Sequence, residues 1–320
     1  MSMEELKYRY SQLSSESVGR LVASHYNIDE VNHCEFYVRG LHDNYLIKDN
    51  DETFILRIYR NDWRSRDEIL FELELLAFLR DNNSPVAYPL QTKSGGLCFF
   101  IKSPEGERAA ALFPYADGCA PGNKITVAES ALLGNTIAEL HNITETFKPN
   151  HSRIFLNITH LLDESILAIQ PFVDKKVYSY LCMLQNEIKD NLPKLSQESP
   201  VYGICMGDVN PTNFHINNND IITLFDFDQC GYGYRAFEIG KFISSIQSVE
   251  AKGDIADAFI DGYQQVRHLT QDELHAIPHF VKISRIWVMA IHVYNASHIG
   301  YKWLEKPFWD RHIALLQAMD

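Results

Sequence analysis

The stretch from Met206 to Asp228, MGDVNPTNFHINNNDIITLFDFD, carries the most information about the fold and chemistry of this chain. It places two acidic residues, Asp208 and Asp226, on either side of a predicted hairpin. Two β-rich runs, 214–216 and 221–225, flank a polar turn, which is the usual signature of paired antiparallel strands. Such a hairpin brings the loop before its first strand beside the end of its second strand. We therefore expect Asp208 to lie near Asp226.

Asn213 follows Asp208 by five residues, and this arrangement suits phosphoryl transfer. In such reactions one carboxylate orients and deprotonates the attacking hydroxyl, while a second carboxylate and an amide oxygen hold Mg²⁺ against the phosphates. Asp and Asn supply the oxygen ligands that Mg²⁺ prefers. An Asp, an Asn five residues later and a further Asp also occur in the protein-kinase signature. We expect Asp208 to be the catalytic base, and Asn213 and Asp226 to be magnesium ligands.

These motifs resemble those of the aminoglycoside phosphotransferase and choline kinase family, whose members have a protein-kinase-like fold. The family's catalytic loop reads H-G-D-x-H-x-x-N, and its metal motif is an apolar residue, Asp, then an aromatic or aliphatic residue. Here the loop is Met206–Asn213 and the metal motif is Leu224–Asp228. Met206 and Asn210 stand where the family has His. The sequences of these motifs, with G-Y-G-Y-R at 231–235, most resemble those of the broad bacterial homoserine-kinase-like or stress-kinase-like branch.

The resemblance implies ATP and Mg²⁺ as cofactors, with a phosphate-binding cation early in the chain. Arg57 lies in the predicted strand 54–59, where many kinases have a lysine that reaches the α- and β-phosphates. Glu72, on the predicted helix 67–80, is the expected partner that holds Arg57 in place. Glu74 is expected to face elsewhere, because it lies two residues further along the same helix.

Further nucleotide contacts and a structural anchor follow from the same resemblance. Gly40 and Asn44 correspond to the loop over the phosphates, and Phe113 and Tyr115 to the hinge that receives adenine. Glu238 stands where an acidic residue anchors the catalytic loop in the family.

The expected fold class is α+β, a bilobal protein-kinase-like fold. Residues 1–115 are predicted to form the nucleotide-binding lobe, with helix 4–26 followed by a small antiparallel sheet and one main helix. Residues 116–320 are predicted to form a mostly helical catalytic and substrate lobe. Its expected helices are 126–142, 158–170, 174–190, 235–265, 271–298 and 304–318.

Composition limits the partners and the compartment. The net charge of −13 argues against nucleic acid, because such binders need clustered Lys and Arg against phosphate. The six cysteines are scattered, with no C-x-x-C pair, which indicates reduced thiols in a cytoplasmic protein. No stretch approaches the roughly 18 apolar residues of a membrane span, so no membrane partner is expected. The oligomeric state is left open.

The acceptor is expected to be a hydroxyl of a small molecule, such as an aminoglycoside, an amino alcohol, homoserine or a sugar-like compound. Trp287, Tyr294 and His298 share one helix face and are candidate substrate contacts, as is Asp228. An aromatic pocket would suit a cationic amine, although core packing explains the same spacing. Two alternatives stay open, namely a protein Ser/Thr kinase and a nucleotide-binding pseudokinase. The short segment between Asp228 and the next predicted helix favours a small acceptor.

Overall fold

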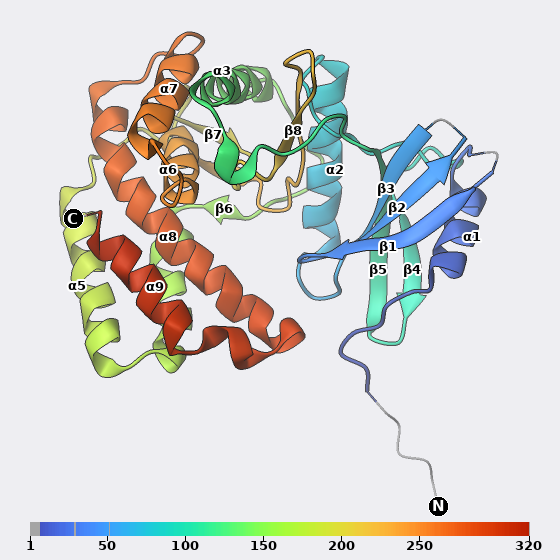
Figure 1. The fold of residues 1–320 in the computed structure, drawn as a ribbon, viewed down its shortest axis with the longest axis horizontal. Coiled ribbons are helices and arrows are strands. Elements are labelled where there is room, and N and C mark those ends of the chain that lie inside the picture. Colours follow the sequence, from blue (N-terminus) through green and yellow to red (C-terminus); the bar gives the residue numbers. More distant parts are fainter. Residues whose placement is uncertain (1–6, 29, 51, 320) are drawn as a thin grey trace, which may run out of the picture. The chain divides into compact units, whose positions relative to one another are not determined.

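The computed structural model describes residues 7–28, 30–50 and 52–319, and it divides the chain into two compact units (Figure 1). The first unit contains the residues up to Asp117 and a later piece, Lys148–Arg153, which we call the return segment. The second unit contains Gly118–Phe147 and the chain from Ile154 onward. The first unit is therefore built from two separate stretches of sequence. The expected assignment of 1–115 to nucleotide binding and 116–320 to catalysis stays a prediction.

An antiparallel five-stranded sheet in the order β1-β2-β3-β5-β4 forms the framework of the first unit (Figure 1). Along β3, Phe54, Leu56 and Ile58 are buried, while Arg57 points to the opposite face of the sheet. The buried face packs against α1 in one apolar cluster. The strands are β1 (His33–Arg39), β2 (Asp43–Asp49), β3 (Glu52–Ile58), β4 (Phe99–Ser103) and β5 (Gly106–Pro114).

Two helices of the first unit begin at side-chain caps. The side chain of Ser14 accepts from the backbone N–H of Ser17, and α1 (Ser15–His25) starts there. The expected helix 4–26 is wrong for residues 7–14, which are not helical, and residues 4–6 lie outside the described residues. Helix α2 (Arg66–Asp81) agrees with the expected helix 67–80 and begins at a reciprocal capping box between Ser65 and Glu68.

The return segment binds the outer side of α2. Both oxygens of Asp67 accept hydrogen bonds, one from His151 at 2.7 Å and the other from the backbone N–H of Ser152 at 2.6 Å. The hydroxyl of Ser152 also donates to Asp67, and this bond, with those from the Ser152 N–H and His151, lowers the pKa of Asp67 to about 2. Further along, Glu74 accepts two hydrogen bonds from Asn150, both at 3.1 Å. Glu74 therefore contacts the return segment, whereas Glu72 on the same helix pairs with Arg57.

The second unit is mainly helical, with two small sheets ordered β6-β10-β7 and β8-β9. Helices α3 and α7 approach closely, since a Cβ on Gly134 would lie 2.1 Å from the carbonyl oxygen of Phe259, and one on Gly262 would lie 2.0 Å from that of Ala131. The long α8 runs beside α6 (Figure 1). The helices are α3 (Val127–Thr144), α4 (Ser165–Ile169), α5 (Lys175–Asn191), α6 (Arg235–Ser245), α7 (Lys252–Gln264), α8 (Gln271–Ile299) and α9 (Lys306–Gln317).

Four of the five short strands of the second unit lie within or next to the stretch Met206–Asp228. The strands are β6 (Phe155–Leu156), β7 (Tyr202–Cys205), β8 (Phe214–Ile216), β9 (Ile222–Leu224) and β10 (Gly231–Tyr234). The remaining turns are the 3-10 helices η1 (Gly122–Lys124), η3 (Gln170–Phe172) and η4 (Tyr301–Leu304), and the π-helical turn η2 (Thr159–Glu164).

Two expected helices are interrupted. The expected helix 235–265 is divided into α6 and α7, and Ala251, immediately before α7, has a φ of 55° that a continuous helix does not permit. The expected helix 158–170 consists of η2 followed by α4. Periodicity alone could not find these breaks, because the apolar pattern continues across both.

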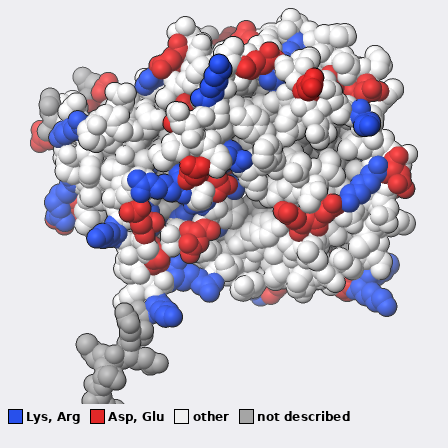
Figure 2. All heavy atoms as spheres, turned by 180° about the vertical axis from the view of Figure 1, so that it is seen from behind, with Lys and Arg blue, Asp and Glu red and all other residues white. Residues whose placement is uncertain are grey.

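Within the described residues, none of the helices is long and apolar enough to cross a membrane. On the face drawn in Figure 2, acidic and basic side chains are interspersed among uncharged ones.

Candidate active site

Asp208 lies in the loop between β7 and β8, and donors contact both oxygens of its carboxylate. The amide nitrogen of Asn213 donates to Oδ2 at 2.8 Å and to the backbone oxygen of Asp208 at 3.0 Å. The ammonium group of Lys241 lies 2.5 Å from Oδ1. Because the carboxylate is 31% exposed, solvent or a small molecule can still reach it.

Asn210 closes the loop at the position where the family has a second His. Its amide nitrogen donates to the backbone oxygen of Asp208 at 3.1 Å, and its side-chain oxygen accepts from the backbone N–H of Thr212 at 2.8 Å. The Asn at this position therefore makes local hydrogen bonds that stabilise the turn. Met206, at the first His position, has a buried side chain.

The hairpin of β8 and β9 joins Asn213 to the segment of Asp226. The strands pair antiparallel, and the backbone N–H of Phe225 donates to the carbonyl oxygen of Asn213 at 3.0 Å. Asp226 itself has a φ of 63°, in the left-handed region that non-glycine residues rarely adopt. Strained backbone of this kind is concentrated at functional sites, where the surrounding contacts maintain it.

Glu238, on α6, holds the backbone of the loop between β7 and β8. Its two carboxylate oxygens accept from the backbone N–H groups of Met206 at 2.7 Å and Gly207 at 2.8 Å. Gly207 has a φ of 84°, and a Cβ there would lie 2.0 Å from the carbonyl oxygen of Gln229. The residue before Asp208 must therefore be glycine on two grounds, backbone conformation and space. Lys241 lies one helical turn after Glu238, so one helix contacts both the backbone and the carboxylate of this loop.

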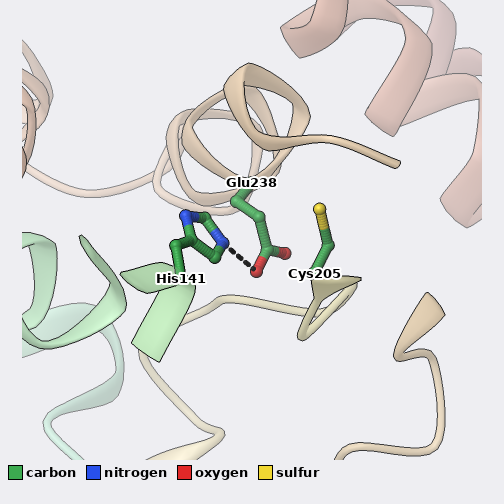
Figure 3. Close-up of side chains that lie close together, drawn as sticks. All are labelled: His141, Cys205 and Glu238. Atoms are coloured by element: carbon green, nitrogen blue, oxygen red, sulfur yellow. Dashed lines mark ion pairs between the residues drawn. The ribbon is translucent and has the colours of Figure 1, made fainter. Parts of the chain in front are cut away.

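Glu238 belongs to a buried group of three side chains, with His141 and Cys205, shown in Figure 3. Nε2 of His141 is 3.4 Å from an oxygen of Glu238, and its Nδ1 is 2.8 Å from the hydroxyl of Tyr263. Burial raises the pKa of Glu238 to about 7, and it lowers the pKa of His141 well below its usual value.

The ligand atoms of His141, Cys205 and Glu238 lie within 4.8 Å of one another, a spacing that a metal ion could use. Two observations favour a hydrogen-bonded core instead. Both oxygens of Glu238 already accept backbone N–H groups. Burial also raises the pKa of the Cys205 thiol well above its usual value, whereas metal binding needs the thiolate.

In the first unit, Arg57 and Glu72 form an ion pair at 3.4 Å. Glu72 is fully buried and also accepts from the hydroxyl of Tyr59 at 3.2 Å. The guanidinium group of Arg57 lies 5.8 Å from the centre of the Phe113 ring. This pair lies on the sheet face opposite α1, and its cation is held by a carboxylate on α2.

The other predicted nucleotide contacts lie on β2, in the turn before it and directly after β5. Asn44 is the β2 residue paired with Arg57, and Gly40 lies in the turn between β1 and β2, where its N–H donates to the carbonyl oxygen of His42 at 3.1 Å. Tyr115 follows β5 and donates its backbone N–H to Thr53 at 2.9 Å.

The candidate acceptor contacts differ in their surroundings. Trp287 is buried and packs edge-on against Phe237 of α6, with ring centres 5.7 Å apart. Tyr294 is 41% exposed, and His298 lies partly buried near the end of the same helix. Asp228 is buried and accepts from the side chain of Gln229 at 3.0 Å. Trp287 thus contributes to the core, while Tyr294 is open to solvent.

A model of the phosphotransferase enzyme family matches residues 34–274, in agreement with the resemblance found in the sequence. An uncharacterised protein of Synechocystis sp. is 38% identical over 312 residues, which cover 97% of this chain and 86% of that protein.

Two solved structures are also similar. The microcompartment-associated aminopropanol kinase has a TM-score of 0.78 at 21% identity, covering 95% of each chain. The amicoumacin kinase hAmiN, in complex with AMP-PNP, Ca²⁺ and Ami, has a TM-score of 0.79 at 19% identity, covering 97% of this chain and 93% of that one. At these identities the structures establish the fold, and the expected kinase-like α+β fold is confirmed.

Proposed function

Since the chain belongs to the phosphotransferase enzyme family, we propose that it transfers the γ-phosphate of ATP to a hydroxyl of a small molecule, with Mg²⁺ bound. Its class, a phosphotransferase with an alcohol group as acceptor, is the one expected from the sequence. The observation that carries the proposal is the fixed pair of Asp208 and Asn213, with 2.8 Å between the carboxylate and the amide.

Asp208 is the proposed base. Lys241 and Asn213 each contact one oxygen of its carboxylate, and a carboxylate has about four acceptor positions in all. The remaining positions suit an approaching hydroxyl, whose proton Asp208 would orient and accept. Positioning of this kind provides much of the catalysis in phosphoryl transfer, where little covalent chemistry falls to the protein.

The residues around Asp226 fit a divalent cation. The amide nitrogen of Asn213 is directed at Asp208, so its amide oxygen is the atom that could coordinate a metal. Asp226 adds a carboxylate oxygen, giving the hard donor set that Mg²⁺ prefers. When bound, the cation would neutralise phosphate charge. The related amicoumacin kinase was solved with AMP-PNP and Ca²⁺, which supports a nucleotide with a divalent cation here.

In the first unit, we assign the nucleotide to the face that carries Arg57. The guanidinium group, held by the buried carboxylate of Glu72, would donate to the α- and β-phosphates, and Arg can do so through two N–H groups at once. Gly40 and Asn44 would contribute at the phosphates, and Phe113 with Tyr115 at the adenine.

The acceptor class is an aminoglycoside, an amino alcohol, homoserine or a sugar-like compound. Tyr294 and His298 stay candidate contacts, and Asp228 is a further one. Trp287 would act only through packing, because it is buried against α6. The segment after Asp228 passes directly through β10 into α6, which leaves no room for a long activation loop and favours a small acceptor over a protein substrate. A cytoplasmic location stays a prediction, supported by six free cysteines.

The decisive experiment measures ATP consumption with Mg²⁺ against a panel of amino alcohols, homoserine, sugars and aminoglycosides. Asp208→Asn should abolish transfer while nucleotide binding persists. Asp163→Asn is the matched control, since Asp163 is also about one-third exposed and pairs with a lysine, Lys189, at 2.7 Å. Equal turnover in wild type and Asp208→Asn would remove Asp208 as the base. Nucleotide binding without turnover on any acceptor would favour the pseudokinase.

A further inference from the structure

Lys241 is a buried lysine whose ammonium group lies directly against the proposed base. Its side chain is 5% exposed, and its Nζ lies 2.5 Å from Oδ1 of Asp208. No motif in the sequence pointed to it. It comes from α6, whereas Asp208 lies in the loop after β7, 33 positions earlier in the chain.

The burial of this ammonium group is difficult to explain by stability alone. Removing a charge from water is costly, and replacing both members of a buried ion pair by apolar side chains of similar volume is often neutral for stability. Lys241 pairs with a carboxylate that remains partly exposed and could be solvated by water instead. Lys241 lies among buried residues of α6, and such positions are seldom occupied by lysine.

The geometry does explain the lysine if its task is to fix the carboxylate. Lys241 contacts Oδ1 and Asn213 contacts Oδ2, so the two donors together determine the plane in which the carboxylate lies. Glu238, one turn earlier on α6, fixes the backbone of the same loop. With only Asn213 as a donor, the side chain of Asp208 could rotate about its own bonds.

We propose that Lys241 is the positioning residue for Asp208, holding its carboxylate so that the remaining acceptor positions face the acceptor hydroxyl. This inference rests on the proposed function of Asp208 and adds a residue to that site. The role is exerted through Asp208, so it requires no contact between Lys241 and the substrate. A displacement of a reacting group by about 1 Å can lower the rate on the order of 100-fold.

The kinetic test replaces Lys241 by Met, which keeps an unbranched side chain one atom shorter and removes the charge. We expect kcat to fall 10- to 100-fold while the KM for ATP stays near that of wild type. The melting temperature should also change little, because the Asp208 side chain is 31% exposed and water can solvate its charge. The shorter Lys241→Ala variant should regain activity with added ethylammonium, in a saturating manner, because the small cation can occupy the vacated space beside Asp208.

Lys282→Met and Lys282→Ala are the matched controls. Lys282 is also buried and lies 3.6 Å from a carboxylate, that of Glu187, but on α8. These controls should keep the wild-type kcat and gain nothing from ethylammonium. A purely structural role for Lys241 would instead lower the melting temperature in proportion to the loss of rate and give no rescue by the amine, and this result would overturn the inference.

A second measurement separates this inference from the proposed function. In a crystal structure of Lys241→Met we expect the carboxylate of Asp208 to be turned, with its bond to Asn213 lost or lengthened. An unchanged carboxylate would refute the positioning role even if no acceptor in the panel were ever phosphorylated. Failure of the whole panel with wild type would count against the proposed function alone, since the crystal structure still decides the role of Lys241.

Discussion

Gly207→Ala should damage both the stability and the activity of the chain, because it places a methyl group where the structure has no space. The new Cβ would lie 2.0 Å from the carbonyl oxygen of Gln229, so a shift of at least 1.0 Å is needed to reach even a tight contact of 3.0 Å. Such overpacking costs about 1–3 kcal/mol. The φ of 84° adds about 1–2 kcal/mol for a residue with a side chain. The expected loss is therefore about 2–5 kcal/mol.

The shift would also move Asp208, the next residue, and a displacement of this size can lower the rate of transfer by about 100-fold. The free energy of unfolding is measured by urea denaturation and the rate by ATP consumption. Gly253→Ala is the control, since a Cβ there meets no atom within 4 Å and Ala favours a helix by up to about 1 kcal/mol. If both alanine variants were as stable and as active as wild type, the reasoning from Gly207 would be refuted.

Three further predictions concern Glu238, which holds the backbone before Asp208, and Arg57, the proposed phosphate contact. Glu238→Gln leaves one acceptor for the two N–H groups of Met206 and Gly207, so denaturation should show a loss of about 1–3 kcal/mol. Because burial raises the pKa of Glu238 from 4.5 to about 7, its folded form holds a proton that the unfolded chain releases between these values. Its contribution to stability is complete below pH 4.5 and is lost as the pH rises through about 7, so the advantage of wild type over Glu238→Gln is greatest below pH 4.5. Over that window wild type should lose roughly 3 kcal/mol relative to the variant, enough to cancel the advantage. Arg57→Met removes a charged donor to phosphate, and calorimetry should show ATP binding weakened by about 10- to 100-fold.

Controls for these variants come from exposed ion pairs of the same units. Glu164→Gln removes a half-exposed carboxylate beside His160 and should leave stability and its pH dependence near those of wild type. Arg80→Met removes a surface cation paired with Asp81 and should leave ATP affinity unchanged. A stability difference for Glu238→Gln that does not vary with pH would contradict the buried, raised-pKa carboxylate. Unchanged affinity in Arg57→Met would exclude Arg57 from the phosphate site.

Local sequence rules were sufficient for the parts of the site that lie within one or two elements. The contact between Asp208 and Asn213 follows from their five-residue spacing in one loop, and the hairpin after it follows from two short β-rich runs around a polar turn. The pairing of Arg57 with Glu72 could be predicted from two local rules, the alternation of side chains along a strand and the face of the next helix on which each residue lies.

Contacts between distant elements could not be read in the same way. In the sequence, Lys241 has no feature that distinguishes it from other helical lysines, and its contact with Asp208 depends on the packing of α6 against the loop after β7. Its position three residues after Glu238 predicts only that both side chains lie on one side of the helix. The His141 contact to Glu238 joins α3 to α6 across nearly 100 residues. The left-handed backbone of Asp226 had no local signal either, since Asp is only one of several residues that tolerate it.

The return segment has a consequence for recombination between relatives. Because Lys148–Arg153 packs on α2, a gene fragment that ends at residue 117 would encode the sheet and α2 without the partners of Asp67 and Glu74. A chimaera joined at that single crossover would pair α2 of one parent with the return segment of the other. Parents that differ at either side of this contact would give poorly folded hybrids, while exchange of both stretches together would preserve it. Crossovers that survive in nature are therefore expected to inherit residues 67–74 and 150–153 as one block.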